Sequence, residues 1–166
     1  MSGGASTDGR EDRRYPGRPI VGVGAVLVHD GHVVLARRRF EPLAGQWSLP
    51  GGGLEVGETL HDGLQREVRE ETGLEVEVGP LVDLFEPILR DPDGRVRHHY
   101  VILDYLCRAT GGAPAAGSDV DRIALADPRD LAAYALAEAA ARVIARGVEM
   151  ARAMGWWASG PDSRRR

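Results

Sequence analysis

Three glutamates, Glu67, Glu70 and Glu71, lie within five consecutive positions of a segment with helical periodicity. Their i, i+3 and i+4 spacing lets the three carboxylates point towards one site. On a helical wheel Glu67 and Glu71 fall on the side of the apolar residues Leu60 and Leu64, where carboxylates would repel one another and lose hydration. A divalent cation relieves this most directly, and Mg²⁺ prefers oxygen ligands. The spacing is therefore compatible with a magnesium site.

The basic residues among these glutamates allow a second interpretation. Arg66 can pair with Glu70 or Glu58 and fix one carboxylate in place. A solvated helix in which Arg66 and Arg69 form salt bridges with the acids needs no metal, and this is the usual state of a run of charges. The glycines at 51–53 permit a close backbone approach, and an exposed carbonyl there is another candidate ligand. The wheel alone leaves both interpretations open.

The elements that must position these residues follow from periodicity and turn signals. The glutamates belong to a helix expected over 59–72, with Gly73 as its C-terminal cap. A Gly- and Pro-rich loop over 41–53 precedes it. The other expected elements are strands over 20–28 and 32–39 joined by a turn, one or two strands over 75–89, a turn over 91–94, a strand over 97–108, a loop over 109–118, a short strand over 123–126 and a helix over 131–154. Hairpins with two helices indicate an α/β or α+β layered fold.

The length and composition favour one domain and exclude several function classes. The chain has 166 residues, which fits a domain over 19–157 between flexible tails at 1–18 and 158–166. The single cysteine, Cys107, forms no intrachain disulfide, which suits a reducing cytoplasm. The absence of lysine excludes a Walker or Schiff-base lysine, and the net charge of −4 argues against broad nucleic-acid binding. No apolar run reaches the length of a membrane helix, and the N-terminus lacks the apolar stretch of a signal peptide, so we expect a cytoplasmic protein without membrane partners.

The glutamate segment resembles the Nudix box, Gly-x5-Glu-x7-Arg-Glu-aliphatic-x-Glu-Glu-x-Gly-aliphatic. The matching residues are Gly52, Glu58, Arg66, Glu67, Val68, Glu70, Glu71, Gly73 and Leu74. A looser likeness to small Nudix pyrophosphohydrolases runs from about residue 20 to 144. The resemblance implies a Nudix-type α/β/α sandwich with a mixed β-sheet, whose catalytic helix follows a Gly-rich loop. It also implies Mg²⁺-dependent hydrolysis, with Mn²⁺ as a substitute, of a nucleoside diphosphate linked to a moiety X by water attack on phosphorus.

Roles can be carried over from this resemblance residue by residue. Glu67 and Glu71 correspond to the main metal ligands, and Glu70 to a ligand or to the base that activates water. Arg66 corresponds to a residue that orients a glutamate, and Glu58 to a structural partner or outer ligand. In some family members the base lies in a later loop, where this chain offers Asp119 and Asp121 instead. The catalytic candidates are Glu70 and Arg66, the metal ligands Glu67, Glu70, Glu71 and Gly52, and the structural residues of the box Glu58 and Gly73.

Candidate substrate contacts surround this segment. Strand alternation puts Arg37 and Arg39 on one face and Arg38 on the other, and at least one of them is expected to reach a phosphate or a ribose. Trp47 is favoured as a core residue but is also able to stack on a base. One of His98 and His99 is expected to line the substrate cleft. The candidate substrate-binding residues are Arg37, Arg39, Trp47, Glu55 and His98.

The overall pattern resembles the branch often called ADP-ribose pyrophosphatase, which makes ADP-ribose or another nucleotide sugar the expected substrate. The first alternative is a MutT-like enzyme that removes oxidised dNTPs from the nucleotide pool. A second is a non-catalytic Nudix domain that senses a nucleotide. The expected partner is a nucleotide-derived small molecule, and a helix over 135–154 leaves a homodimer open. Trp156 and Trp157 are expected to pack against the body of the domain or against a partner.

Overall fold

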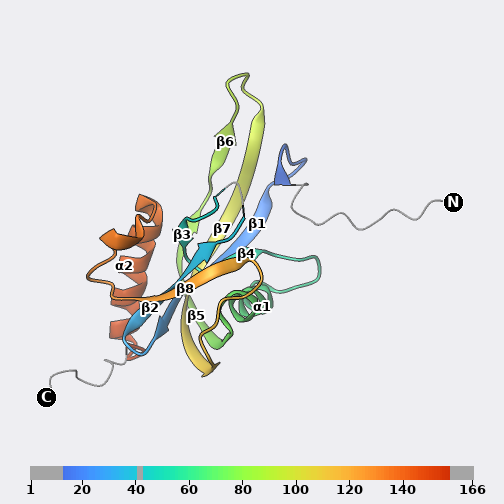
Figure 1. Cartoon of the computed structure of the whole chain (residues 1–166). Helices are drawn as coiled ribbons and strands as arrows, with labels where there is room; N and C mark the ends of the chain where they lie inside the picture. The colour runs from blue at the N-terminus through green and yellow to red at the C-terminus, as the bar shows by residue number, and fades with distance from the viewer. Residues whose placement is uncertain (1–12, 41–42, 158–166) are drawn as a thin grey trace, which may run out of the picture.

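The computed structural model describes residues 13–40 and 43–157, and its strands form a mixed sheet. The elements are β1 (Ile20–His29), β2 (His32–Arg38), β3 (Trp47–Ser48), β4 (Gly51–Gly53), α1 (Leu60–Thr72), β5 (Leu74–Phe85), β6 (Ile88–Arg90), β7 (Val96–Gly112), β8 (Val120–Ala126), a 3₁₀ turn (Ala132–Tyr134) and α2 (Glu138–Ala153). The sheet order is β3-β2-β1-β7-β5, with β4 on β1, β6 on β7 and β8 on β2. Strands β1 and β7 run parallel, whereas β1 and β2 are antiparallel (Figure 1). The prediction of a mixed sheet is confirmed.

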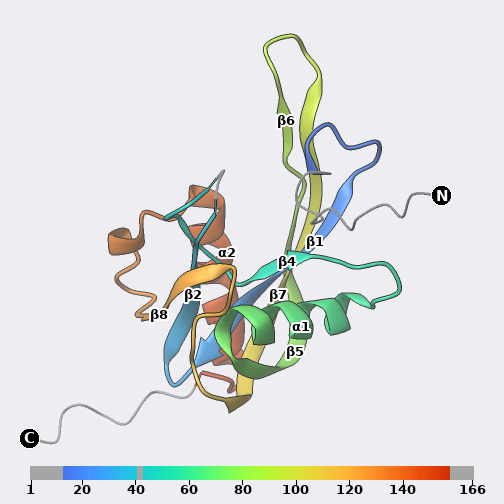
Figure 2. The same ribbon diagram turned by 45° about the vertical axis from the view of Figure 1, so that its right-hand side comes forward.

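The two helices cover opposite faces of this sheet (Figures 1 and 2). Alternate residues of β1 serve the two layers: Leu27 packs in one core with Leu64 of α1, whereas Val26 packs in another with Val143 and Ala151 of α2. Burying a side chain of this size stabilises the fold by roughly 1.5–3 kcal/mol. The prediction of an α/β/α sandwich is therefore confirmed.

Helix α1 begins and ends at capping residues. The Thr59 hydroxyl accepts a hydrogen bond from the backbone N–H of Asp62 at 3.2 Å, and Gly73 adopts a left-handed conformation with φ +71°. The Gly73 N–H donates to the Arg69 carbonyl. The predicted helix and its cap are confirmed, and they fix the rotation of the acidic residues about the helix axis.

Three predicted segments differ from the structure. The expected loop over 41–53 contains the short strands β3 and β4. Strand β4 could not be recognised from the sequence because it consists of glycines, which show no alternation of apolar and polar residues. The expected loop over 109–118 was wrong at its start, because β7 continues to Gly112. The expected helix over 131–154 is interrupted, because Ala135 takes a left-handed conformation with φ +46° and α2 starts only at Glu138.

A long hairpin of β6 and β7 projects beyond the rest of the sheet (Figure 2). Its turn is the one predicted over 91–94, closed by hydrogen bonds from the Asp91 N–H to the Arg95 carbonyl at 3.0 Å and from the Gly94 N–H to the Asp91 carbonyl at 2.9 Å. Residues 13–19, part of which was expected to be a tail, contact this hairpin. The remainder of the expected tails, 1–12 and 158–166, lies outside the described residues.

The aromatic pair after α2 packs on the body of the domain. Trp156 joins the core beneath α2, where a Cβ on Gly79 would lie 2.6 Å from its ring, and the Arg108 guanidinium lies 4.8 Å from the ring centroid. Trp157 joins the same face. Among the described residues, no helix is both long and apolar enough to span a bilayer.

Candidate functional site

The glycines of β4 bring the backbone directly against the acidic face of α1. Gly51 has φ +147°, a conformation that glycine alone adopts readily, and it lies opposite Gly24 of β1. A Cβ on Gly52 would lie 2.5 Å from both carboxylate oxygens of Glu67. Because Gly51 and Gly52 have no side chains, the backbone forms a cradle for the Glu67 carboxylate. This close approach explains why glycines occupy these positions.

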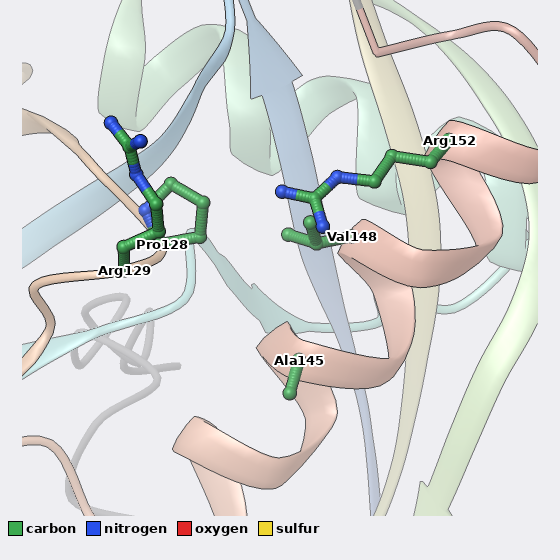
Figure 3. A pocket seen from close by; sticks show the side chains of 5 residues that line it. All are labelled: Pro128, Arg129, Ala145, Val148 and Arg152. Carbon is green, nitrogen blue, oxygen red and sulfur yellow. The ribbon is translucent and has the colours of Figure 1, made fainter.

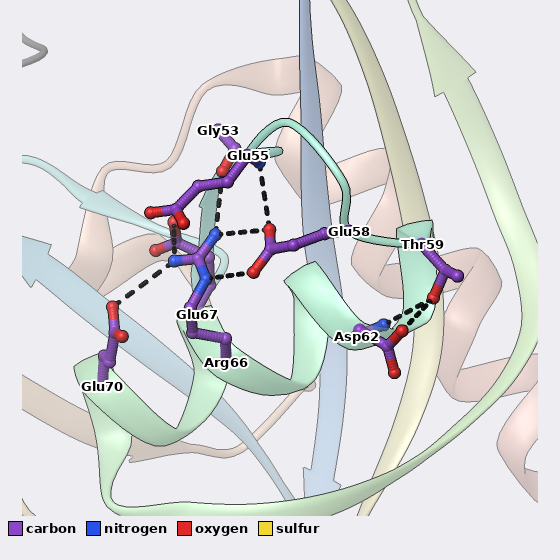
Figure 4. Close-up of polar contacts among 8 residues, drawn as sticks. All are labelled: Gly53, Glu55, Glu58, Thr59, Asp62, Arg66, Glu67 and Glu70. Carbon is purple, nitrogen blue, oxygen red and sulfur yellow. Dashed lines mark hydrogen bonds and ion pairs between the residues drawn. The ribbon is translucent and has the colours of Figure 1, made fainter.

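Arg66 links the acidic residues of α1 to the loop before it (Figure 4). Its Nε donates to Glu58 Oε1 at 2.6 Å and its Nη2 to Glu58 Oε2 at 2.9 Å, a two-pronged contact. Nη2 also donates to the Gly53 carbonyl at 3.1 Å, and Nη1 donates to Glu67 at 2.8 Å and to Glu70 at 3.4 Å. Hydrogen bonding to Arg66 lowers the pKa of Glu58 to about 2. Arg66 and Glu58 therefore form a fixed ion pair beside the other glutamates.

Glu71 is the most perturbed carboxyl of the helix. Its Oε2 accepts a hydrogen bond from the Gly51 N–H at 2.9 Å. Burial raises the pKa of the Glu71 carboxyl to about 7, and the charges of Glu67 and Asp119 raise it too, whereas the Gly51 N–H and the Arg38 guanidinium lower it. The charged form of this side chain consequently lacks a sufficient cationic partner in the protein itself.

Glu67 and Glu70 differ in their surroundings. Burial raises the pKa of Glu67, although Arg66 and Arg13 oppose this effect. Glu70 is 59% exposed, and its contact in the described part of the chain is the long ion pair with Arg66. Glu67 and Glu71 are thus partly buried, as the helical wheel predicts. The side chain of Glu70 is exposed and can change its orientation.

The donor set of α1 fits a hard divalent cation, although other contacts hold its carboxylates apart. In residues 13–40 and 43–157, no three acidic, histidine or cysteine side chains are close enough together to hold a metal as they stand. Arg66 draws Glu67 and Glu70 towards itself, and Gly51 binds Glu71. The donors are nevertheless all oxygens, two of them are poorly hydrated carboxylates that repel each other, and the Gly52 cradle adjoins them.

The loop after β7 closes against the C-terminal end of α1. The Gly117 N–H donates to the Glu71 carbonyl at 3.1 Å, so tightly that a Cβ on Gly117 would overlap the Glu70 carbonyl. This contact brings Asp119 near enough to affect the pKa of Glu71. Asp121 is instead bound to Arg37 by two hydrogen bonds of 2.8 and 2.5 Å. Of the two alternative bases, Asp119 is the one that lies near the glutamates.

Strand β2 ends at Arg38, so the predicted alternation holds for Arg37 and Arg38 only, and it points to a residue that the sequence analysis did not select. Arg37 pairs with Asp121 and lies 5.8 Å from the Trp47 ring centroid, and Arg39 donates to the Val120 carbonyl at 3.2 Å. Arg38 lies on the other face and acts electrostatically on Glu71. Alternation along the strand could have identified Arg38. It lies on the same strand face as Val34, four residues earlier, and Val34 packs in the α1 core.

The remaining candidates lie at the margins. Trp47 packs edge-on against Tyr134, with ring centroids 5.2 Å apart, on the α2 side of the sheet. Glu55 is exposed in the loop before α1, where its N–H donates to Glu58. The His98 ring bonds through Nδ1 to the Arg13 carbonyl at 2.9 Å. The structure does not bring these three side chains together around the glutamates, and their contact with substrate stays a prediction.

A hollow on the opposite face of the sheet is a poorer candidate (Figure 3). It is lined by Pro128, Arg129, Ala145, Val148 and Arg152. Its two arginines are engaged, because Arg129 pairs with Asp127 at 2.6 Å and the Arg152 guanidinium lies 5.3 Å from the Trp157 ring centroid. The α1 face therefore carries the chemically distinctive site.

Comparisons with known proteins converge on one family. The family model described as the NUDIX domain matches residues 18–147. An ADP-ribose pyrophosphatase of Methanocaldococcus jannaschii is 35% identical over 113 residues, which cover 68% of this chain and 64% of the relative. The chain thus spans somewhat less than two thirds of that protein's length.

Similar solved structures point to the same family. A MutT NUDIX hydrolase from Burkholderia pseudomallei superposes with a TM-score of 0.67 at 29% identity, covering 78% of this chain and 98% of that one. An ADP-ribose pyrophosphatase from Streptococcus suis superposes with a TM-score of 0.62 at 27% identity, covering 81% and 93% respectively.

Proposed function

The chain belongs to the Nudix family, and from this premise we propose that it is a Mg²⁺-dependent pyrophosphohydrolase that cleaves a nucleoside diphosphate linked to a moiety X. ADP-ribose or another nucleotide sugar is the favoured substrate, because two of the similar proteins are named ADP-ribose pyrophosphatases. The observation that carries the proposal is the pair of half-buried carboxylates, Glu67 and Glu71, held against the glycines of β4.

Each residue of the site has a role in this proposal. Glu67 and Glu71 would hold the metal, joined by Glu70 and by the Gly52 carbonyl. A divalent ion bound there supplies neutralisation of the pyrophosphate charge and activation of water. Arg66, fixed by Glu58, keeps Glu67 oriented through their 2.8 Å contact. Nudix hydrolases in general use a divalent metal, and we propose Mg²⁺, with Mn²⁺ as a substitute.

Glu70 is the proposed base that takes a proton from the attacking water. Its exposure and its long contact with Arg66 leave it free to turn towards a bound substrate. Asp119 is the alternative, because it lies near Glu71. Glu70→Gln and Asp119→Asn separate the two, since loss of a general base typically costs about 10²–10⁴-fold in kcat whereas loss of a neighbouring charge costs much less.

The test is a panel of nucleoside diphosphate compounds and oxidised dNTPs, incubated with Mg²⁺ and analysed by mass spectrometry. Cleavage of ADP-ribose to AMP and ribose 5-phosphate supports the proposal. Glu71→Gln should abolish the reaction, while the control Glu149→Gln, on the exposed side of α2, should not. Turnover unaffected by Glu71→Gln would contradict the proposed site.

A second candidate substrate is an oxidised dNTP. It is supported by the similarity to the Burkholderia MutT NUDIX hydrolase. The same panel decides, because this activity yields a dNMP and pyrophosphate. Efficient cleavage of 8-oxo-dGTP without cleavage of ADP-ribose would replace the first candidate by this one.

We also propose that the protein is cytoplasmic and forms a homodimer. Size-exclusion chromatography with light scattering tests the dimer.

A further inference from the structure

The segment before β1 brings the guanidinium of Arg13 to the Gly-rich strand β4. Its Nη2 lies 3.3 Å from the position that a Cβ on Gly53 would occupy. The Gly53 carbonyl accepts a hydrogen bond from Arg66 at 3.1 Å. Two guanidinium groups, one from α1 and one from the segment before the sheet, therefore flank Gly53, and the charge of Arg13 reaches Glu67.

The two guanidinium groups differ in how they are used. The guanidinium of Arg66 donates hydrogen bonds to Glu58, Glu67, Glu70 and the Gly53 carbonyl. Arg13 as a residue is half-buried, and its guanidinium has no hydrogen bond or ion pair with any residue of 13–40 and 43–157. A guanidinium offers five donors in a fork that matches a phosphate. Within the part of the chain that the structure describes, Arg13 is thus a cation with unpaired donors beside an acidic site.

The position of Arg13 is fixed by its neighbours on the β6–β7 hairpin. Its carbonyl accepts a hydrogen bond from His98 Nδ1 at 2.9 Å. Tyr15, with φ +55°, turns the chain back, and its N–H donates to the Arg97 carbonyl at 2.9 Å. Left-handed backbone at a bulky residue is unfavourable and persists where contacts impose it.

The side chain of Tyr15 holds this turn in place. Its hydroxyl donates to Asp91 Oδ2 at 2.5 Å, and the Arg95 guanidinium lies 4.6 Å from its ring centroid. Both partners belong to the turn region of the hairpin. The β6–β7 hairpin lies beside the segment before β1 (Figure 2). Residues 13–19 therefore form a strap alongside the hairpin, with Arg13 at its end.

We propose that Arg13, at the end of the strap of residues 13–19, binds a phosphate of the diphosphate substrate and so completes the substrate site. The inference rests on the proposed function, but Arg13 lies outside the residues matched by the family, which begin at 18. A pyrophosphate carries more negative charge than one divalent ion neutralises, and Arg13 supplies a cation on the side of Gly53.

The test is equilibrium binding of α,β-methylene-ADP, a diphosphate that resists hydrolysis, measured by calorimetry with Mg²⁺ present. Arg13→Ala should weaken binding roughly 10-fold or more, the loss expected for one hydrogen bond to a charged group. The matched control is Arg14→Ala, which removes an exposed arginine of the same strap and should bind as the wild type does. Tyr15→Phe, which removes the hydrogen bond to Asp91, should weaken binding less than Arg13→Ala.

A second readout separates phosphate binding from a merely electrostatic role. Without nucleotide, the Mg²⁺ affinity of Arg13→Ala should equal or exceed that of the wild type, because a cation near Glu67 is removed. Equal nucleotide affinity in wild type and Arg13→Ala overturns the inference, as does a fall in Mg²⁺ affinity that accounts for the whole loss. If the wild type itself binds no diphosphate, the proposed function fails, and this result is distinct from a failure of Arg13 alone.

Discussion

The carboxyl of Glu71 makes the stability of the protein depend on pH and on Mg²⁺ in a way that can be calculated. Its pKa is about 7 in the folded chain and 4.5 in the unfolded chain, because burial penalises its charged form. Since the folded pKa is raised, the folded state binds the proton more tightly than the unfolded state. The contribution of this group to stability is therefore highest below pH 4.5 and is lost as the pH rises to about 7.

The size of this loss follows from the shift. A difference of about 2.5 pKa units corresponds to at most about 3 kcal/mol at pH 8 in the metal-free protein. Glu71→Gln removes the charge while retaining an oxygen that can accept the Gly51 N–H. In EDTA this variant should be more stable than the wild type at pH 8 by up to that amount, with no gain at pH 4.5.

Mg²⁺ should reverse this order. The ion stabilises the wild type because it binds the folded state, and it should do so more at pH 8 than at pH 6, where protons compete for Glu71. Urea denaturation at both pH values, with EDTA or Mg²⁺, measures the effect, and Glu149→Gln on α2 is the control. Parallel pH profiles for the wild type and Glu71→Gln in EDTA would refute the reasoning.

Three further predictions test neighbouring features. Lowering the pH from 6 to 3 should narrow the difference in melting temperature between wild type and Glu58→Gln, since the folded pKa of Glu58 is about 2 and its stabilising contact with Arg66 is lost as the pH falls towards that value. Gly52→Ala should lower kcat/KM by about 100-fold or more, because its Cβ would displace the Glu67 carboxylate. Asp104→Asn should raise the unfolding free energy at pH 8 by up to about 3 kcal/mol and leave it unchanged at pH 4, because burial raises the pKa of Asp104 to about 6.

Each of these has a clear contrary outcome. A difference in melting temperature between wild type and Glu58→Gln that stays constant down to pH 3 would show that the Arg66–Glu58 ion pair does not stabilise the fold. Gly17→Ala, at a glycine with no atom within 4 Å of its would-be Cβ, is the control for Gly52→Ala, and equal activity of the two variants would contradict the cradle. A destabilised Asp104→Asn at pH 8 would show that the buried carboxyl has an acceptor role that outweighs its desolvation.

The sequence predicts the acidic helix well because its signals are local. Thr59 and Gly73 mark its ends, and the 3.6-residue period places Glu67 and Glu71 on the inner side, as the structure shows. The turn at 91–94 is likewise encoded in four consecutive residues. These features need no knowledge of distant parts of the chain.

Features that depend on distant pairing are less visible in the sequence. Strand β4 forms because β1 offers a partner at Gly22 to Gly24, which no periodicity within 51–53 announces. The break before α2 arises at Ala135, an alanine with left-handed backbone, where composition favours helix. The approach of Arg13 to Gly53 joins residues forty positions apart through the hairpin, and no local signal predicts it.

The most direct test of the metal site is anomalous diffraction from crystals soaked in Mn²⁺. We predict an anomalous peak from a Mn²⁺ ion bound by the carboxylates of Glu67 and Glu71, and we expect this peak to disappear in crystals of Glu71→Gln. Crystals with no peak at this helix, and with both side chains turned into solvent, would contradict it.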